Sequence, residues 1–260
     1  MNIILSLILS TALAAFAALK KSLTSGACVL AWVFAVIIAY CGGITAFTGL
    51  LFTFAFTIAA GKISKSKREK IESTIHKKKG PRDIVQIICN VMCGSICILA
   101  YGITSREIFA YGFFGAMAAS LSDSLASELG ILAKKDPVNI CTMQKTKPGM
   151  SGGVTLWGLL CSLIGAMLIA VPAIFKISGI APFIIITVSG FIAALIDSIL
   201  GGSLQAKYEC PVCGLISEKP LHCDEKGKLV KGLSFLNNDG VNLLNNISGA
   251  VIAMILSAII

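Results

Sequence analysis

Three carboxylates lie inside long apolar stretches of the sequence, where an ionised group is costly. Asp123 and Glu128 fall within residues 107–131, and Asp197 falls within residues 180–203. Ionisable groups in such stretches are rare and usually mark a functional site. Carboxylate oxygens suit Mg²⁺, which typically binds one or two carboxylates together with phosphates. The residues therefore predict a Mg²⁺ site. The alternative is that each carboxylate pairs with a lysine or caps a neighbouring helix.

A single helix does not easily bring Asp123 and Glu128 to one metal ion. The two residues are five apart, which offsets them by about 140° around a helix. We therefore expect Asp197, from another helix, to complete the site. Other polar residues gather near the same ends of the apolar stretches, and they are Gln86, Asn90, Ser124, Ser127, Ser198, Asp239 and Asn242.

A glycine-rich loop precedes the apolar stretch 152–171. Consecutive glycines let backbone N–H groups approach an anion, and the start of a helix adds its positive dipole end. The spacing is not that of a P-loop, and a simple turn between two helices is the alternative. The residues that we assign to phosphate contact are Lys145, Thr146, Lys147, Gly149, Ser151, Gly152 and Gly153.

Segment 204–240 carries a cysteine and histidine pattern, Cys210-Pro-Val-Cys213-Gly followed by His222-Cys223. Two thiolates of a Cys-x-x-Cys-Gly turn, with a later His and Cys, can surround Zn²⁺ as a tetrahedron. The sequence therefore predicts a structural zinc site. A redox-active dithiol is the alternative, because the adjacent His222-Cys223 pair is an unusual second half.

The elements that must position these groups are membrane-spanning helices. The chain has 260 residues, of which 56% are hydrophobic and 13% charged, whereas soluble domains average about 25% charged. A span needs about 20 apolar residues, and its backbone must form a helix. We expect a single all-α domain over 1–260, with the first stretch retained rather than cleaved as a signal peptide. The eight predicted spans are 2–19, 25–42, 45–61, 84–103, 107–131, 152–171, 180–203 and 241–260, with a break at Gly42-Gly43.

Basic residues fall on one side of these predicted spans. With the N-terminus outside, 20 of the 22 Lys and Arg residues lie in cytoplasmic segments, as the positive-inside rule requires. This split explains the net charge of +9 without nucleic acid as a partner. The basic loop 62–83 holds Lys62, Lys65, Lys67, Arg68 and Lys77–Lys79. We expect that loop either to contact anionic headgroups or to act as a solvated determinant of topology.

In its motifs the chain resembles the integral membrane family that contains transmembrane protein 19 and the plant phytyl-phosphate kinase. Two departures from the family pattern are Met150-Ser151, where Thr-Asn is expected, and Gly202, where Ala is expected. The motifs that carry the resemblance are Arg82–Asn90, Asp123–Gly130, Pro148–Val154, Asp197–Gln205, Cys210–Cys213, His222-Cys223 and Asn238–Asn242.

The resemblance implies phosphoryl transfer from a nucleoside triphosphate, with CTP as the expected donor, to an isoprenyl monophosphate at the cytoplasmic face of the cell membrane. The pattern Asp123–Gly130 followed by Lys145-Thr146 and Gly149 is also similar to CTP-dependent polyprenol kinases and phosphatidate cytidylyltransferases. Together these resemblances imply catalytic roles for Lys145 and for the carboxylates of Asp123, Glu128 and Asp197. They also imply that Arg82 contacts phosphate. The other residues that we assign to nucleotide or phosphate binding are Gln86, Asn90, Ser124, Ser127, Ser198, Gln205, Asp239 and Asn242.

Other functions remain open from the sequence. A cytidylyltransferase would use the same residues to make a CDP-lipid. A transporter or lipid scramblase would place its site near the bilayer midplane, whereas the polar residues here gather at one face. A scaffold would leave the intramembrane carboxylates unexplained. The expected partners are a nucleoside triphosphate, a prenyl phosphate lipid and the membrane, with a homo-oligomer possible.

Overall fold

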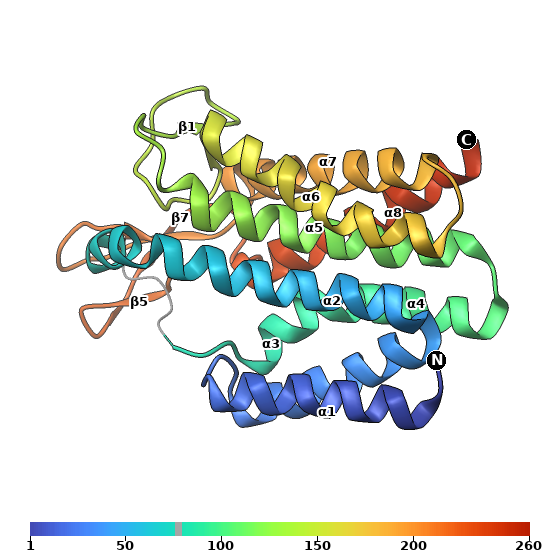
Figure 1. Ribbon diagram of the computed structural model, residues 1–260. Helices are drawn as coiled ribbons and strands as arrows, with labels where there is room; N and C mark the ends of the chain where they lie inside the picture. Colours follow the sequence, from blue (N-terminus) through green and yellow to red (C-terminus); the bar gives the residue numbers. More distant parts are fainter. Residues whose placement is uncertain (76–79) are drawn as a thin grey trace.

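Helices take up nearly all of the apolar sequence. The computed structural model describes residues 1–75 and 80–260 (Figure 1). One element, η1, is a π-helix, a rare form that often occurs at functional sites. The helices are α1 (Ile3–Leu19), α2 (Ser25–Ile75), α3 (Ile84–Ile87), η1 (Ile88–Met92), α4 (Cys93–Thr104), α5 (Glu107–Gly130), α6 (Leu156–Lys176), α7 (Ala181–Ser203) and α8 (Asn238–Ile259).

Gly43 divides α2 into two arms. Its φ of 75° and ψ of −168° lie outside the helical region, in backbone space that glycine adopts without a steric penalty. The chain turns back on itself at this point (Figure 1). The predicted break at Gly42-Gly43 is therefore confirmed.

The predicted bundle of apolar helices typical of an integral membrane protein is confirmed, although the described part of the chain also forms seven short β-strands outside the helices. Among the described residues, six helices are long and apolar enough to cross a membrane, while α1 is apolar but has 17 residues. The two arms of α2 count there as one helix, so eight spans remain a prediction. The six are Ser25–Glu69, Ile84–Thr104, α5, α6, α7 and α8.

Helix α5 lies at the centre of the bundle and packs against α2, α4, α6, α7 and α8. Small residues let these helices approach closely. A Cβ atom added to Gly115 would lie 2.3 Å from the Gly249 carbonyl oxygen of α8. One added to Gly190 of α7 would lie 2.6 Å from Ala118 Cβ. The centre of α5 is therefore fixed on several sides, and its C-terminal turns carry Asp123 and Glu128.

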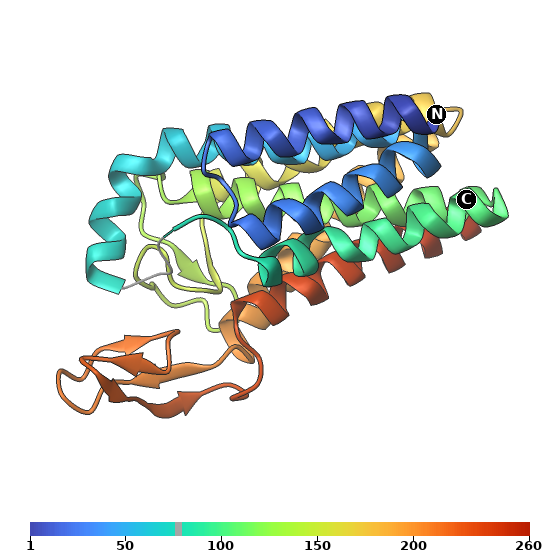
Figure 2. The same ribbon diagram turned by 90° about the horizontal axis from the view of Figure 1, so that it is seen from below.

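The polar segments gather at one end of the bundle, and both termini lie at the other end (Figures 1 and 2). The expected basic loop 62–83 is helical as far as Ile75, since lysine, arginine and glutamate are good helix formers. Lys77–Lys79 of that loop lie outside the described residues. This end also holds segment 131–155, where β1 (Val138–Asn139) pairs with β2 (Gly153–Val154).

A small β module follows α7 and projects from the same end (Figure 2). Its three-stranded sheet has the order β4-β3-β7, and β5 pairs with β6 as a hairpin. The strands are β3 (Lys207–Glu209), β4 (Ile216–Ser217), β5 (Leu221–His222), β6 (Glu225–Lys226) and β7 (Lys228–Lys231).

Candidate functional site

A cavity of about 770 Å³ lies where α5, α7 and α8 meet segment 131–155 and the β module. Its volume is in the range of small-molecule sites. Asp123, Asp197 and Asp239 all line it, so three helices contribute a carboxylate to one space. The sequence-predicted residues that line it are Gln86, Asp123, Ser124, Ser127, Glu128, Gly149, Ser151, Gly152, Gly153, Asp197, Ser198, Asp239 and Asn242.

Glu128 is bound by protein groups. Arg68, on the extension of α2, forms a close ion pair with its Oε1, and the Ser64 hydroxyl donates to its Oε2 at 2.9 Å. Glu128 is buried, with 9% of its surface exposed. The pairing of a carboxylate with a cation, which was the alternative to a metal site, therefore applies at Glu128. Metal contact by Asp123 and Asp197 stays a prediction.

Basic side chains that sequence reasoning left out of the site also line the cavity. Lys67 and Arg68 come from α2, Lys134 and Lys135 follow α5, and Lys219 comes from the β module. The sequence signal was their place in the predicted cytoplasmic segments, where they were interpreted as determinants of topology or, in loop 62–83, as contacts to anionic headgroups. Around a shared cavity, these cations can bind the charges of a polyphosphate.

The glycine loop packs on the end of α7. Gly152 has a φ of +83°, and a Cβ atom there would lie 2.2 Å from Gly202 Cα. Helix α6 begins only at Leu156, with Thr155 as its N-cap, so Gly152 and Gly153 do not sit at the start of the helix as expected. The loop reaches the cavity because two glycines allow its backbone to touch that of α7.

Two amides of the glycine loop already have protein acceptors. The Ser151 N–H donates to Glu218 Oε1 at 3.0 Å, and the Gly153 N–H donates to the Met150 carbonyl at 3.1 Å. The expected cradle of free amides is therefore not formed by Ser151 and Gly153 in this conformation.

Lys145, Thr146 and Lys147 do not line the cavity. Residue Lys145 forms an antiparallel bridge with Val138, and the Thr146 N–H donates to the Pro137 carbonyl at 2.9 Å. This pairing holds the strand-like segment beside β1, with Lys145 and Lys147 exposed. The structure thus separates Lys145 from the carboxylates with which the sequence grouped it.

Three more predicted residues lie outside the lining. Asn90, in η1, donates to the Gln86 carbonyl at 2.8 Å and accepts from Ser120 at 3.2 Å. Arg82 forms a backbone bridge with Leu23 between α1 and α2. Gln205 is 1% exposed and lies just beyond the end of α7. Asn90 supports Gln86, which does line the cavity, whereas Arg82 and Gln205 join elements of the fold.

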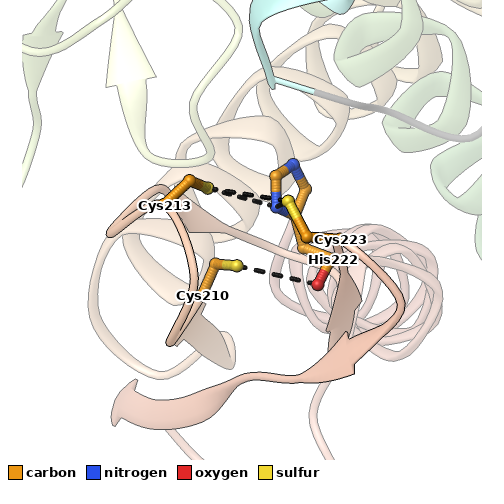
Figure 3. Close-up of side chains that lie close together, drawn as sticks. All are labelled: Cys210, Cys213, His222 and Cys223. Carbon is orange, nitrogen blue, oxygen red and sulfur yellow. Dashed lines mark hydrogen bonds between the residues drawn. The ribbon is translucent and has the colours of Figure 1, made fainter.

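The cysteine and histidine residues of the β module form one cluster (Figure 3). The ligand atoms of Cys210, Cys213, His222 and Cys223 all lie within 4.8 Å of one another. His222 Nδ1 is 3.4 Å from Cys213 Sγ and 3.1 Å from Cys223 Sγ. Ligand sulfurs about 2.3 Å from Zn²⁺ would be about 3.8 Å apart in a tetrahedron, close to the 4.0 Å between Cys213 and Cys223. The sequence-predicted ligands are therefore together in space.

Hydrogen bonding within the cluster favours thiolate at one position. The backbone N–H of Cys213 lowers the pKa of the Cys210 thiol to about 6, against an opposing effect of desolvation. Desolvation raises the pKa of Cys223 to about 11, reinforced by its cysteine neighbours. Metals bind the deprotonated form, so Cys210 is already prepared as a ligand.

A second hollow of about 600 Å³ adjoins the cavity. Ala133, Lys134, Lys135 and Asp136 line both spaces. Its remaining wall is largely apolar, and it includes the exposed Leu156 and Trp157 at the start of α6. Tryptophan is enriched where a membrane meets water, so this hollow joins the polar cavity to the predicted membrane boundary.

Known proteins resemble the chain over most of its length. Protein PGR of Arabidopsis thaliana is 28% identical over 222 residues, 75% of this chain and 76% of that protein. Protein VTE6, chloroplastic, from the same plant is 25% identical over 214 residues, 80% of this chain and 57% of that protein. An uncharacterized membrane protein of Methanocaldococcus jannaschii is 25% identical over 224 residues, 85% of this chain and 79% of that protein. No solved structure matches the chain.

These relatives agree with the match to a family profile, which runs from residue 8 to residue 250. The resemblance seen in the sequence motifs is therefore confirmed. The chain is a member of the family described as integral membrane protein DUF92.

Proposed function

We propose that this protein transfers the γ-phosphoryl group of a nucleoside triphosphate, CTP by preference, to an isoprenyl monophosphate such as phytyl or geranylgeranyl phosphate. The observation that carries the proposal is the cavity in which Asp123 and Asp197 share one space with Lys67, Lys134 and Lys219. Phosphoryl transfer depends mostly on positioning and on neutralising charge. Acidic and basic side chains around one cavity are suited to that task.

The chemistry needs no strong general base. A phosphate oxygen of the prenyl phosphate attacks the γ-phosphorus, the bond to the β-phosphate oxygen breaks, and the nucleoside diphosphate leaves with that electron pair. The products are a prenyl diphosphate and a nucleoside diphosphate. The acceptor is already an anion, so the protein has mainly to align the two phosphates.

The carboxylates suit a divalent cation. Asp123 and Asp197 would hold Mg²⁺, because carboxylate oxygens are its usual protein ligands. When bound, Mg²⁺ would supply positive charge that offsets the negative charge of the phosphates. The basic side chains of Lys67, Lys134 and Lys219 would hold the outer phosphate oxygens. We assign Zn²⁺ to the separate cysteine and histidine cluster as a structural ion.

The apolar hollow beside the cavity suits the isoprenoid chain. Leu156 and Trp157 would contact the hydrocarbon, while Lys134 and Lys135, which line both spaces, would contact the lipid phosphate. A lipid dissolved in the cell membrane would then present its phosphate to a nucleotide arriving from the cytoplasm. Family resemblance to the plant phytyl-phosphate kinase supports this choice of substrate class.

The test is a product assay in liposomes. Purified protein is incubated with Mg²⁺, each nucleoside triphosphate in turn, and phytyl or geranylgeranyl phosphate, and the lipids are identified by mass spectrometry. We expect a prenyl diphosphate. Asp123→Asn and Asp197→Asn should each lower turnover by on the order of 100-fold or more. Glu107→Gln is the matched control, since Glu107 is exposed in the first turn of α5, far from the cavity.

Two outcomes would contradict the proposal. A CDP-lipid with release of pyrophosphate would assign the cavity to a cytidylyltransferase. Absence of any lipid product from folded protein would remove the enzyme assignment and direct the next test to transport in the same liposomes.

A further inference from the structure

The β module is too small to hold its fold by apolar burial alone. Of residues 206–236, all of which the structure describes, the buried apolar ones are Ala206, Cys210 and Leu236. Domains below about 40 residues usually need a disulfide, a metal or a partner for stability. The described cysteines are all free, so the cysteine and histidine cluster is the feature that can supply a cross-link.

Backbone conformation brings the two halves of this cluster together. The Gly214 N–H donates to the Cys210 carbonyl at 2.9 Å, which closes the Cys210–Cys213 turn. In the β5–β6 hairpin, Cys223 and Asp224 have φ angles of 52° and 58°, as a two-residue turn of this kind requires. Positive φ is costly for a cysteine. In this hairpin the positive φ places Cys223 beside His222 in the cluster, although the two residues are adjacent in sequence.

The same module is hydrogen-bonded to the glycine loop at Ser151. Glu218 Oε1 accepts from the Ser151 N–H at 3.0 Å, and Lys207 Nζ donates to the Ser151 carbonyl at 3.3 Å. Lys207 is buried, and burial lowers the pKa of its ammonium group. The backbone N–H and the carbonyl of Ser151, which lines the main cavity, are thus both hydrogen-bonded to side chains of the β module.

The two residues that bind Ser151 lie close in sequence to the cysteine and histidine cluster. Lys207 lies three residues before Cys210, and Glu218 lies between Cys213 and His222. A further lysine of the module, Lys231, donates to the Gly202 carbonyl of α7 at 2.6 Å. The segments that hold Ser151 therefore run directly into the cluster residues.

We infer that Cys210, Cys213, His222 and Cys223 bind one Zn²⁺, and that the zinc-ordered module sets the position of the glycine loop through Glu218 and Lys207. Three sulfurs and one imidazole nitrogen form a closed tetrahedral set, which is typical of structural zinc. Its role is to fold the module and, through Ser151, to fix one wall of the cavity. The inference needs no substrate, so it stands apart from the proposed phosphoryl transfer.

The experiment measures metal content and backbone exchange together. Protein purified under reducing conditions is analysed for metals by mass spectrometry, and we expect about one zinc per chain. Hydrogen–deuterium exchange is then compared before and after removal of zinc with a strong chelator. Faster exchange is expected in residues 206–236 and also in residues 148–155. Adding Zn²⁺ back should restore both.

Matched variants separate the effect of the metal from the effect of the hydrogen bonds to Ser151. Cys213→Ser should lose zinc and loosen both segments, whereas Cys28→Ser, in the first arm of α2 and outside both segments, should change neither. Glu218→Met and Lys207→Met should keep zinc yet speed exchange in residues 148–155, with Lys228→Met as the exposed control. Absence of zinc from folded, reduced protein would overturn the metal site. Retention of slow exchange in 148–155 after zinc removal would overturn the coupling.

Discussion

Arg68, on the basic extension of α2, forms an ion pair with Glu128 near the end of α5. The Glu128 side chain is 11% exposed and that of Arg68 is 41% exposed, so the pair closes one side of the cavity from a segment expected to be a loop. Ser64, one turn before Arg68, binds the other oxygen of the same carboxylate. These contacts explain why the helix continues past the apolar stretch.

Removal of Arg68 should destabilise the protein. Arg68→Met would leave a mostly buried carboxylate without its cation, at a cost of about 1–3 kcal/mol, near the lower figure because Arg68 is partly exposed. Thermal unfolding in detergent measures the loss. The double variant with Glu128→Gln should recover part of it, since no buried charge then remains. Equal stability of the single variant and the parent would contradict a structural role for the pair.

The close contact between Gly152 and Gly202 should not tolerate a methyl group. Gly152→Ala would meet backbone at 2.2 Å and adopt a φ of +83°, so we expect a displaced loop and loss of turnover. Gly179→Ala is the control, because Gly179 has a φ of +105° with nothing within 4 Å of an added Cβ. That variant should show the backbone cost alone, about 1–2 kcal/mol. Thermal unfolding and product assay of both variants are compared, and equal effects would argue against the packing.

The structure and the sequence pattern differ over which lysine lies at the cavity. Lys219 lines the cavity, whereas Lys145 is exposed and does not. Lys219→Met should raise the KM for the nucleotide roughly fivefold, as the loss of about 1 kcal/mol predicts, with kcat little changed. Lys145→Met should leave both constants unchanged. A larger defect from Lys145→Met would restore the catalytic role that the sequence pattern suggested.

Trp157 should affect the lipid and not the nucleotide. Trp157 lies in the apolar hollow and is 49% exposed. Trp157→Ala would remove apolar contact with an isoprenoid chain and raise the KM for the lipid by on the order of tenfold. Trp157→Phe keeps an aromatic surface and should recover most of that loss. A change in the KM for the nucleotide alone would show that the lipid lies elsewhere.

The sequence by itself determined the class of the fold and the end of the bundle at which the polar residues gather. Apolar run length requires helices in lipid, and the break at Gly43 follows from two adjacent glycines. Placement of Asp123, Asp197 and Asp239 on one cavity also follows from their positions near the same ends of their helices. The four residues of the cysteine and histidine cluster were recognisable because their spacing is local along the chain.

Tertiary structure alone decided which polar groups face one another. Glu128 is bound by Arg68 of α2, sixty residues away, and no helical periodicity encodes such a partner. Lys145 follows Asp123 and Glu128 in sequence, yet its backbone pairs with Val138 and its side chain does not line the cavity. The hydrogen bond from the Ser151 N–H to Glu218 likewise joins the glycine loop to the β module, two segments that are distant in sequence. Contacts between distant segments depend on how helices pack, so composition and spacing located the site without assigning the partners within it.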